Sequence, residues 1–219
     1  SIAKIIDNYV DVILIGDSVG TAIYGMSNTQ GVSLSMMIRH GKTVLNSSKK
    51  AFTIIDMPHN TYRNKNEALF NAQKIIAETG CQSVKLETDH KNIEIINYLT
   101  KNKINVVSHI GVTPQKYKNF NKIRSVGKSN KEKEKITDLA MKLQIAGSSM
   151  IVLECIKESL AKDITDKLKI PTIGIGASAA CDGQVLVIND ILSTDNLNRK
   201  LRFVKSYANL SKIIDSVNL

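Results

Sequence analysis

Short, unbroken apolar runs alternate along this chain with longer segments in which apolar residues recur at helical spacing. The runs are rich in β-branched residues and are bounded by turn-forming or polar residues, which is typical of strands buried on both faces. Such a series predicts a sheet at the centre of the fold. The seven predicted strands lie near residues 12–16, 51–55, 83–86, 105–108, 149–153, 172–175 and 185–188.

Helical patterns fill most of the gaps between the predicted strands. Ser33 and Asn64 stand where N-caps belong, and Gly80 and Gly147 follow two helices as C-terminal caps. Repeated alternation of strand and helix predicts a parallel sheet with right-handed crossovers. The predicted helices lie near 33–47, 65–79, 91–102, 132–146, 157–168 and 199–216.

A further helical pattern, from Ile2 to Tyr9, opens the chain with no strand before it. An open doubly wound sheet and a closed barrel both fit this order. Acidic residues at most strand ends favour a (β/α)8 TIM barrel, because such barrels carry their active sites there. Its first strand is missing from residues 1–219, and we expect it before Ser1, since unpaired strand edges are a liability. No linker divides the chain, so one catalytic barrel domain over 1–219 is predicted.

Acidic residues close four of the predicted strands: Asp17, Asp56, Glu87 and Glu154. A carboxylate is costly to desolvate, so one at a strand end is usually paired, hydrated or bound to a cation. Asp17, Asp56 and Glu87 offer hard oxygen ligands, which suit Mg²⁺ or Mn²⁺ better than zinc. Because Mg²⁺ keeps several waters, some of the three could act through water. Each acid alone could instead be structural, as a cap for Asp17 or the start of a turn for Asp56.

Lys85 and His109 belong to the same rim, and Glu154 differs from the other acids there. Lys85 lies two residues before Glu87 and faces the same way, either to meet an anionic ligand or to form a structural pair with Glu87. His109 ends a strand and is either an active-site group or a satisfied core residue. Glu154 stands alone among apolar neighbours and is a candidate proton acceptor. The aperiodic segment 111–130 has the length of a lid or ligand-binding loop.

Composition narrows the range of partners. The net charge of +10 comes from lysines scattered along the chain, which also has few aromatic residues and no tryptophan. This pattern argues against nucleic-acid binding and is compatible with anionic small substrates. No apolar run approaches the roughly 18 residues of a membrane span. Cys81, Cys155 and Cys181 form no CxxC pair, so a zinc site or disulfide framework is not expected and a cytoplasmic location is. Cys155 is interpreted as a small core residue.

Seven segments occur in an order that resembles one known family. They are VILIGDSVG, TIIDMP, VKLE, HIGVTPQ, IVLEC, IPTIGIGA and DGQVLV. Together they resemble the 3-methyl-2-oxobutanoate (ketopantoate) hydroxymethyltransferases, over most of the chain from Ile2 to Leu210. The resemblance implies a barrel of the phosphoenolpyruvate/pyruvate type, a homodecamer, and Mg²⁺. It also implies transfer of a hydroxymethyl group from 5,10-methylenetetrahydrofolate to 3-methyl-2-oxobutanoate, giving 2-dehydropantoate for pantothenate and coenzyme A biosynthesis.

The resemblance also implies roles for the residues at the strand ends. Asp17, Asp56 and Glu87 would hold Mg²⁺, and Glu154 would be the proton acceptor. These agree with the chemistry argued from the residue types alone. The residues expected to contact the oxoacid are Asp17, Ser18, Asp56, Lys85 and His109.

The chain departs from the family pattern at a few positions. Ser108 replaces a glycine before the histidine, Ser178 replaces a glycine after GIGA, and residues 121–123 replace a Gly-Gly-aromatic sequence. These departures concern loop closure and folate contacts rather than the metal or the base. A carbon–carbon lyase of the isocitrate lyase type is an alternative, although its cysteine-bearing KKCGH-like loop is absent. A catalytically silent barrel subunit is a third hypothesis.

Overall fold

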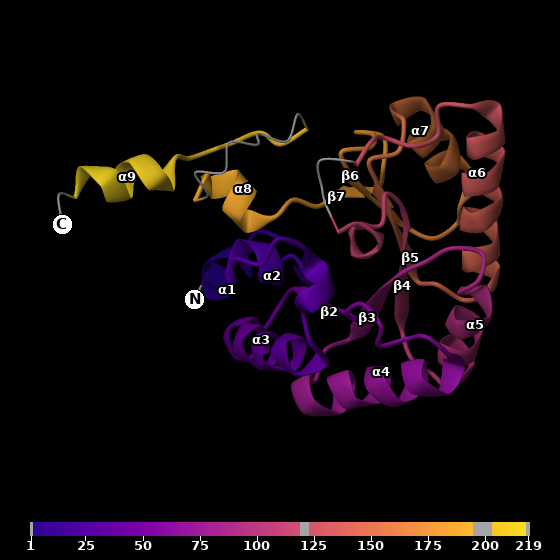
Figure 1. Ribbon diagram of the computed structural model, residues 1–219, viewed down its shortest axis with the longest axis horizontal. Helices are drawn as coiled ribbons and strands as arrows, with labels where there is room; N and C mark the ends of the chain where they lie inside the picture. Colours follow the sequence, from indigo (N-terminus) through magenta and orange to yellow (C-terminus); the bar gives the residue numbers. More distant parts are fainter. Residues whose placement is uncertain (1, 119–122, 195–202, 218–219) are drawn as a thin grey trace.

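The computed structural model describes residues 2–118, 123–194 and 203–217 (Figure 1). In this part of the chain seven strands form one sheet, in which each strand pairs in parallel with the next. The predicted parallel α/β order is therefore confirmed, and β1 and β7 are the two edges of the sheet. The strands are β1 (Val12–Ile15), β2 (Phe52–Asp56), β3 (Ser83–Glu87), β4 (Val106–Gly111), β5 (Met150–Glu154), β6 (Thr172–Ile175) and β7 (Gly183–Gln184).

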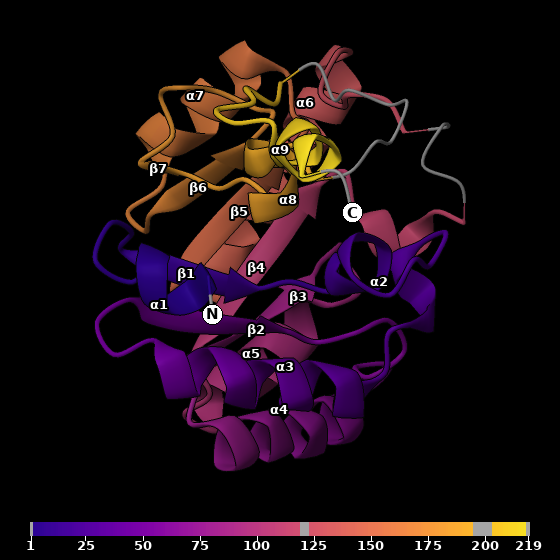
Figure 2. The same cartoon turned by 90° about the vertical axis from the view of Figure 1, so that its left-hand side faces the viewer.

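Helices cover the outer face of the curled sheet, and the consecutive long helices pack against one another (Figure 2). The helix at the C-terminal end, α9, lies away from the sheet (Figure 1). The longer elements are α3 (Leu34–Ser47), α4 (Lys65–Thr79), α5 (Ile93–Lys101), α6 (Asn130–Ile145) and α7 (Glu158–Lys167). The shorter ones are α1 (Ile2–Ile6), α2 (Val19–Ala22), η1 (Thr29–Gly31), η2 (Pro114–Lys116), α8 (Ile188–Leu192) and α9 (Leu210–Ser216).

The predicted caps are confirmed. The side chains of Ser33 and Asn64 accept hydrogen bonds from backbone N–H groups in the first turns of α3 and α4. Gly80 and Gly147 follow α4 and α6 with φ of 76° and 98°, a conformation that favours glycine. The two N-caps mark where α3 and α4 begin, and the two glycines mark where α4 and α6 end and the chain turns toward the next strand.

Two predictions near the C-terminus are wrong. The last strand lies at Gly183–Gln184 rather than 185–188, and Ile188–Leu192 form the helix α8. As an edge strand, β7 has a single described neighbour, β6, so little holds the following apolar residues in a ladder. The final helix begins at Leu210 rather than near 199; residues 199–202 lie outside the described part.

Successive side chains of each strand point to opposite faces of the sheet, so the strands contribute to two separate apolar clusters. Outward residues such as Ile55, Leu86 and Ile151 are fully buried beneath the helices. Inward residues form a second, smaller cluster around Ile54, Val107 and Val152. That cluster fills the middle of the interior, and polar inward positions follow it toward the carboxyl ends of the strands. The inward-facing charged side chains of these strands thus lie at a single rim.

Candidate active site

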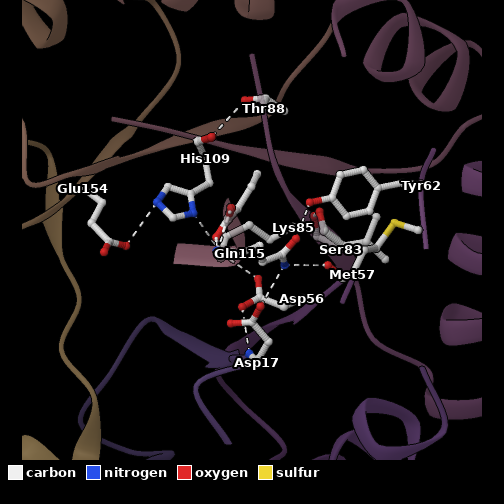
Figure 3. A network of polar contacts seen from close by, with 12 residues as sticks. Asp17, Asp56, Met57, Tyr62, Ser83, Lys85, Thr88, His109, Gln115 and Glu154 are labelled. Carbon is white, nitrogen blue, oxygen red and sulfur yellow. Dashed lines mark hydrogen bonds and ion pairs between the residues drawn. The ribbon is translucent and has the colours of Figure 1, made fainter. Parts of the chain in front are cut away.

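The four predicted carboxylates lie at the carboxyl ends of β1, β2, β3 and β5. Figure 3 labels Asp17, Asp56 and Glu154 among them. Asp17, Asp56 and Glu87 are all buried, and the Asp17 backbone N–H donates to Asp56 Oδ2 at 3.0 Å. Within the described residues, no three carboxylate, histidine or cysteine side chains converge closely enough to hold one metal ion together. Direct ligation by all three acids is therefore absent from this arrangement, which is compatible with the one or two direct carboxylates and several waters that Mg²⁺ commonly takes.

Lys85 is buried and its ammonium lies 2.6 Å from Asp56 Oδ1. The strand register sets this pairing, because Asp56 lies directly opposite Lys85 across β2 and β3. Burial alone would lower the pKa of Lys85, but Asp56 and Asp17 raise it above its ordinary value. Lys85 is therefore a buried cation, and its partner is Asp56 rather than Glu87.

His109 connects this group to Glu154. Its Nε2 lies 3.1 Å from Glu154 Oε2, and its Nδ1 lies 3.5 Å from Lys85 Nζ. The Thr88 side chain donates to the His109 carbonyl oxygen at 3.0 Å, which fixes the backbone there. Glu154 is consequently not surrounded by apolar groups alone, as the sequence suggested. Its side chain is 19% exposed, against 5% for Asp56, so it reaches the open side of the rim.

The charges at the rim do not balance. Burial, followed by repulsion from Asp56, raises the pKa of Asp17 to about 7. Burial also raises the pKa of Glu87 well above its ordinary value. Asp17, Asp56 and Glu87 carry three potential negative charges, and Lys85 offers one positive charge among them. A divalent cation with oxygen preference would supply the missing charge, so the donor set fits Mg²⁺.

Two buried atoms at the rim lack a well-aligned hydrogen bond to any described residue, namely Asp56 Oδ1 and His109 Nε2. Their contacts with Lys85 and Glu154 satisfy an ion-pair distance but not hydrogen-bond directions. Buried polar atoms are usually hydrogen-bonded, and exceptions often mark a missing ligand or water. Both atoms are thus available to a bound molecule.

Gln115, which ends the HIGVTPQ segment, also belongs to this site and was not predicted from the sequence. Its backbone N–H donates to both Glu87 oxygens at 3.0 and 3.2 Å. Its side-chain amide donates to Asp17 Oδ2 at 2.7 Å and to the Met57 carbonyl at 3.0 Å. A polar residue just after Thr-Pro at a strand end was the available signal. The loop after β4 therefore reaches the acids on β1 and β3.

Ser18 and Cys155 have smaller roles in the geometry. Ser18 is half-buried beside Asp17 at the start of α2, and its side chain makes no capping bond. Cys155 is half-buried just past β5 with φ of 49°, rather than a strand residue in the core. Burial and the charge of Glu154 raise the pKa of the Cys155 thiol to about 11. The thiol therefore stays protonated, and the left-handed turn ends β5 directly after Glu154.

Gly111 supports the backbone of Glu154. Its φ is +100°, and a Cβ there would lie 2.2 Å from the Glu154 carbonyl oxygen. We expect Gly111→Ala to displace Glu154, to destabilise the fold by more than the roughly 1–3 kcal/mol of backbone strain, and to lower activity. Chemical denaturation and activity measurements check this prediction.

Gly25→Ala is the matched control for that substitution. Gly25 also has positive φ, +64°, but a Cβ there meets nothing within 4 Å. It should therefore show the strain alone, with activity retained. Equal losses of stability and activity in both variants would contradict a specific contact between residue 111 and Glu154.

Solved structures share this fold at low sequence identity. A phosphoenolpyruvate phosphomutase from Streptomyces platensis subsp. rosaceus aligns with a TM-score of 0.60 and 11% identity, over 98% of this chain and 76% of that one. A 2,3-dimethylmalate lyase, a member of the PEP mutase/isocitrate lyase superfamily, aligns with a TM-score of 0.58 and 12% identity, over 78% and 62%. The fold thus places this chain in the class of parallel α/β proteins that share the architecture of these structures.

Sequence comparison gives the particular family. The profile of the ketopantoate hydroxymethyltransferases matches residues 1–218. The 3-methyl-2-oxobutanoate hydroxymethyltransferase of Pelagibacter ubique (strain HTCC1062) is 49% identical over 219 residues, which are all of this chain and 83% of that protein. That of Rhizobium etli is 46% identical over 98% of this chain and 79% of its own length. The chain therefore belongs to the ketopantoate hydroxymethyltransferase family.

Proposed function

We propose that this chain transfers a hydroxymethyl group from 5,10-methylenetetrahydrofolate to 3-methyl-2-oxobutanoate, giving 2-dehydropantoate in pantothenate and coenzyme A biosynthesis. Family membership supports the reaction. One observation carries the assignment to this site. Asp17, Asp56 and Glu87 are buried carboxyl groups, and burial raises the pKa of Asp17 and of Glu87. Asp17 and Asp56 lie on one side of His109, and Glu154 lies on the other (Figure 3).

Asp17, Asp56 and Glu87 would hold Mg²⁺, in part through water. When bound, Mg²⁺ supplies Lewis acidity that favours loss of a proton next to the keto group of an oxoacid. Lys85 places a positive charge 2.6 Å from Asp56 and would offset the oxoacid carboxylate or the enolate oxygen. Ser18, next to Asp17 at the half-buried start of α2, would contact the same substrate. These residues bind and orient the oxoacid.

Glu154 would remove the proton from C3 of the oxoacid. The C3–H bond breaks, an O–H bond forms on Glu154, and the electron pair becomes the enolate C2–C3 bond as charge moves to the keto oxygen. A positioned base contributes roughly 10²–10⁴-fold to such a step. His109, 3.1 Å from Glu154 Oε2, would orient the carboxylate toward the substrate.

The enolate carbon would then form a bond to the methylene carbon of the folate. Both bonds from that carbon to the folate nitrogens break over the reaction, and one water supplies the hydroxyl group. Tetrahydrofolate and 2-dehydropantoate leave. The atoms balance with one oxoacid, one methylenetetrahydrofolate and one water.

The same proposal covers the wider architecture. The curled sheet would be a single-domain (β/α)8 barrel of the phosphoenolpyruvate/pyruvate type, with one more strand between its edges β1 and β7. Exposed apolar side chains on α1 and α9, such as Ile5 and Ile214, support a homo-oligomer, for which family resemblance suggests a decamer.

Three unpaired cysteines suit the cytoplasm. No described helix has both the length and the apolarity to span a bilayer. Light scattering, which measures the mass of the assembly in solution, tests the proposed homo-oligomer.

A transfer assay tests the function directly. We expect purified protein to consume 3-methyl-2-oxobutanoate and methylenetetrahydrofolate in equal amounts, and to lose this activity when EDTA removes divalent metal. Restoration by Mg²⁺ is the expected control. Cleavage of isocitrate or a phosphonate, with no transfer, would favour the lyase alternative, since fold neighbours include a lyase. Folded, metal-binding protein without any of these activities would favour a silent subunit.

A further inference from the structure

Gln115 is the most fully hydrogen-bonded side chain at the rim, and the reaction as proposed gives it no part. It is buried, at 3% exposed. Both side-chain N–H groups are used, one on Asp17 Oδ2 and one on the Met57 carbonyl oxygen. The amide oxygen accepts from the Tyr62 hydroxyl at 2.5 Å (Figure 3). A buried amide with both donors and its acceptor satisfied has one defined position.

The contacts also determine which way the amide faces. A flipped amide would point its oxygen at the Asp17 carboxylate and its N–H groups at the Tyr62 hydroxyl. Burial, then the charges of Glu87 and Asp17, raise the pKa of Tyr62 well above its ordinary value, so its hydroxyl remains a donor. Because the Met57 carbonyl oxygen can only accept, the amide N–H groups must face it and Asp17, and the Tyr62 hydroxyl donates to the amide oxygen on the other side.

The backbone of Gln115 is held as firmly as its side chain. Its N–H donates to the Glu87 carboxylate, and its carbonyl oxygen accepts from Gln30 Nε2 at 2.8 Å. Nearby, Asn28 Nδ2 donates to the Lys118 carbonyl oxygen at 3.3 Å. The segment after β1 is thus tied to the segment after β4. Through Gln115, the segments following β1, β2 and β4 are connected to one another and to the end of β3.

We propose that Gln115 is a positioning residue that holds Asp17 and Glu87 in the orientation required to bind a divalent cation. One donor on each carboxylate fixes its rotation, and each oxygen retains capacity for a second partner. Partners of this kind beyond the ligands typically change metal affinity by about 10–100-fold. The proposal rests on the proposed function only in assigning Asp17 and Glu87 to Mg²⁺.

Gln115→Met tests it, because methionine has a similar length but neither donates nor accepts at the amide positions, and the backbone bond to Glu87 remains. Calorimetric titration of the substrate-free protein with Mg²⁺ should give a Kd about 10–100-fold higher than wild type. In the transfer assay, the Mg²⁺ concentration for half-maximal rate should rise in parallel. At saturating Mg²⁺, kcat should return close to wild type, a recovery that a merely damaged fold would not show.

Tyr62→Phe is the second variant, and keeps the test valid if Gln115→Met does not fold. It removes only the hydroxyl that locks the amide, so Mg²⁺ should bind about three- to tenfold more weakly. Gln82→Met is the matched control. The Gln82 amide oxygen accepts from the Thr53 N–H and hydroxyl at 2.7 and 2.8 Å, at the opposite ends of β2 and β3. Its loss should leave Mg²⁺ affinity unchanged.

Unchanged Mg²⁺ affinity in folded Gln115→Met or in Tyr62→Phe would overturn the positioning role, whatever the reaction. Failure of wild type to bind Mg²⁺ would overturn it as well. A wild type that binds Mg²⁺ more tightly than Gln115→Met but shows no hydroxymethyl transfer would support the positioning role and refute the proposed function. The two proposals therefore fail in different measurements.

Discussion

Glu154→Gln should largely abolish solvent exchange of the C3 proton of 3-methyl-2-oxobutanoate while Mg²⁺-dependent binding of the oxoacid persists. The glutamine side chain has the same shape and can still contact His109, which lies 3.1 Å from the carboxylate in the wild type. It cannot accept a proton at neutral pH. The exchange rate should therefore fall by roughly 10²–10⁴-fold, the usual contribution of a positioned general base. Proton NMR in D₂O measures the exchange without any folate.

The position of Glu154 explains why binding should survive. It lies across His109 from Asp17 and Asp56, on the more exposed side of the rim (Figure 3). Removing its charge leaves Lys85 and the acids that would hold Mg²⁺ in their mutual contacts. Calorimetry with Mg²⁺ and oxoacid should therefore give a Kd near the wild-type value.

Glu158→Gln provides the matched control for this prediction. It makes the same substitution four residues further along, at an exposed position in the first turn of α7. Exchange should proceed there at the wild-type rate. Exchange by Glu154→Gln at an undiminished rate would remove Glu154 as the base and leave His109 as the next group to test.

The rim could be predicted from sequence because strand geometry transmits position directly. Lys85 and Glu87 are two residues apart on β3, so they share a face wherever that strand lies. Parallel strands end at one side of a sheet, so Asp56 on β2 and Glu154 on β5 had to approach the same rim. These inferences need only the type and direction of each element, which the apolar runs supplied.

The pairing within the rim could not be predicted in the same way. Lys85 pairs with Asp56 rather than Glu87 because of the register between β2 and β3, which a single strand's pattern does not contain. Gln115 lies 98 residues from Asp17 and contacts it through a loop without periodicity. The last strand was misplaced for a related reason, since an apolar run does not show whether a neighbouring strand is present to hold it.

Once divalent metal is removed, the stability of this protein should fall as pH rises, and the fall should depend on Asp17. Burial and Asp56 raise the pKa of Asp17 from 3.8 to about 7. Between these values the native state keeps a proton that the unfolded chain has lost, so the unfolding free energy falls as pH rises. Relative to Asp17→Asn, wild type in EDTA should lose a few kcal/mol across this window, because each pKa unit corresponds to about 1.4 kcal/mol. Urea unfolding at several pH values measures this difference.

Saturating Mg²⁺ should reverse that slope, because a cation that binds only the native state adds stability and favours the ionised carboxylate. The gain from Mg²⁺ should be larger near about pH 8 than near about pH 5, and smaller in Asp17→Asn than in wild type at both. Asp11→Asn, at an exposed aspartate just before β1, should gain as much from Mg²⁺ as wild type. If Mg²⁺ stabilised Asp17→Asn as strongly as wild type, Asp17 would not be a metal ligand. A flat difference between wild type and Asp17→Asn in EDTA would instead mean that the buried carboxylate finds its compensating charge within the protein.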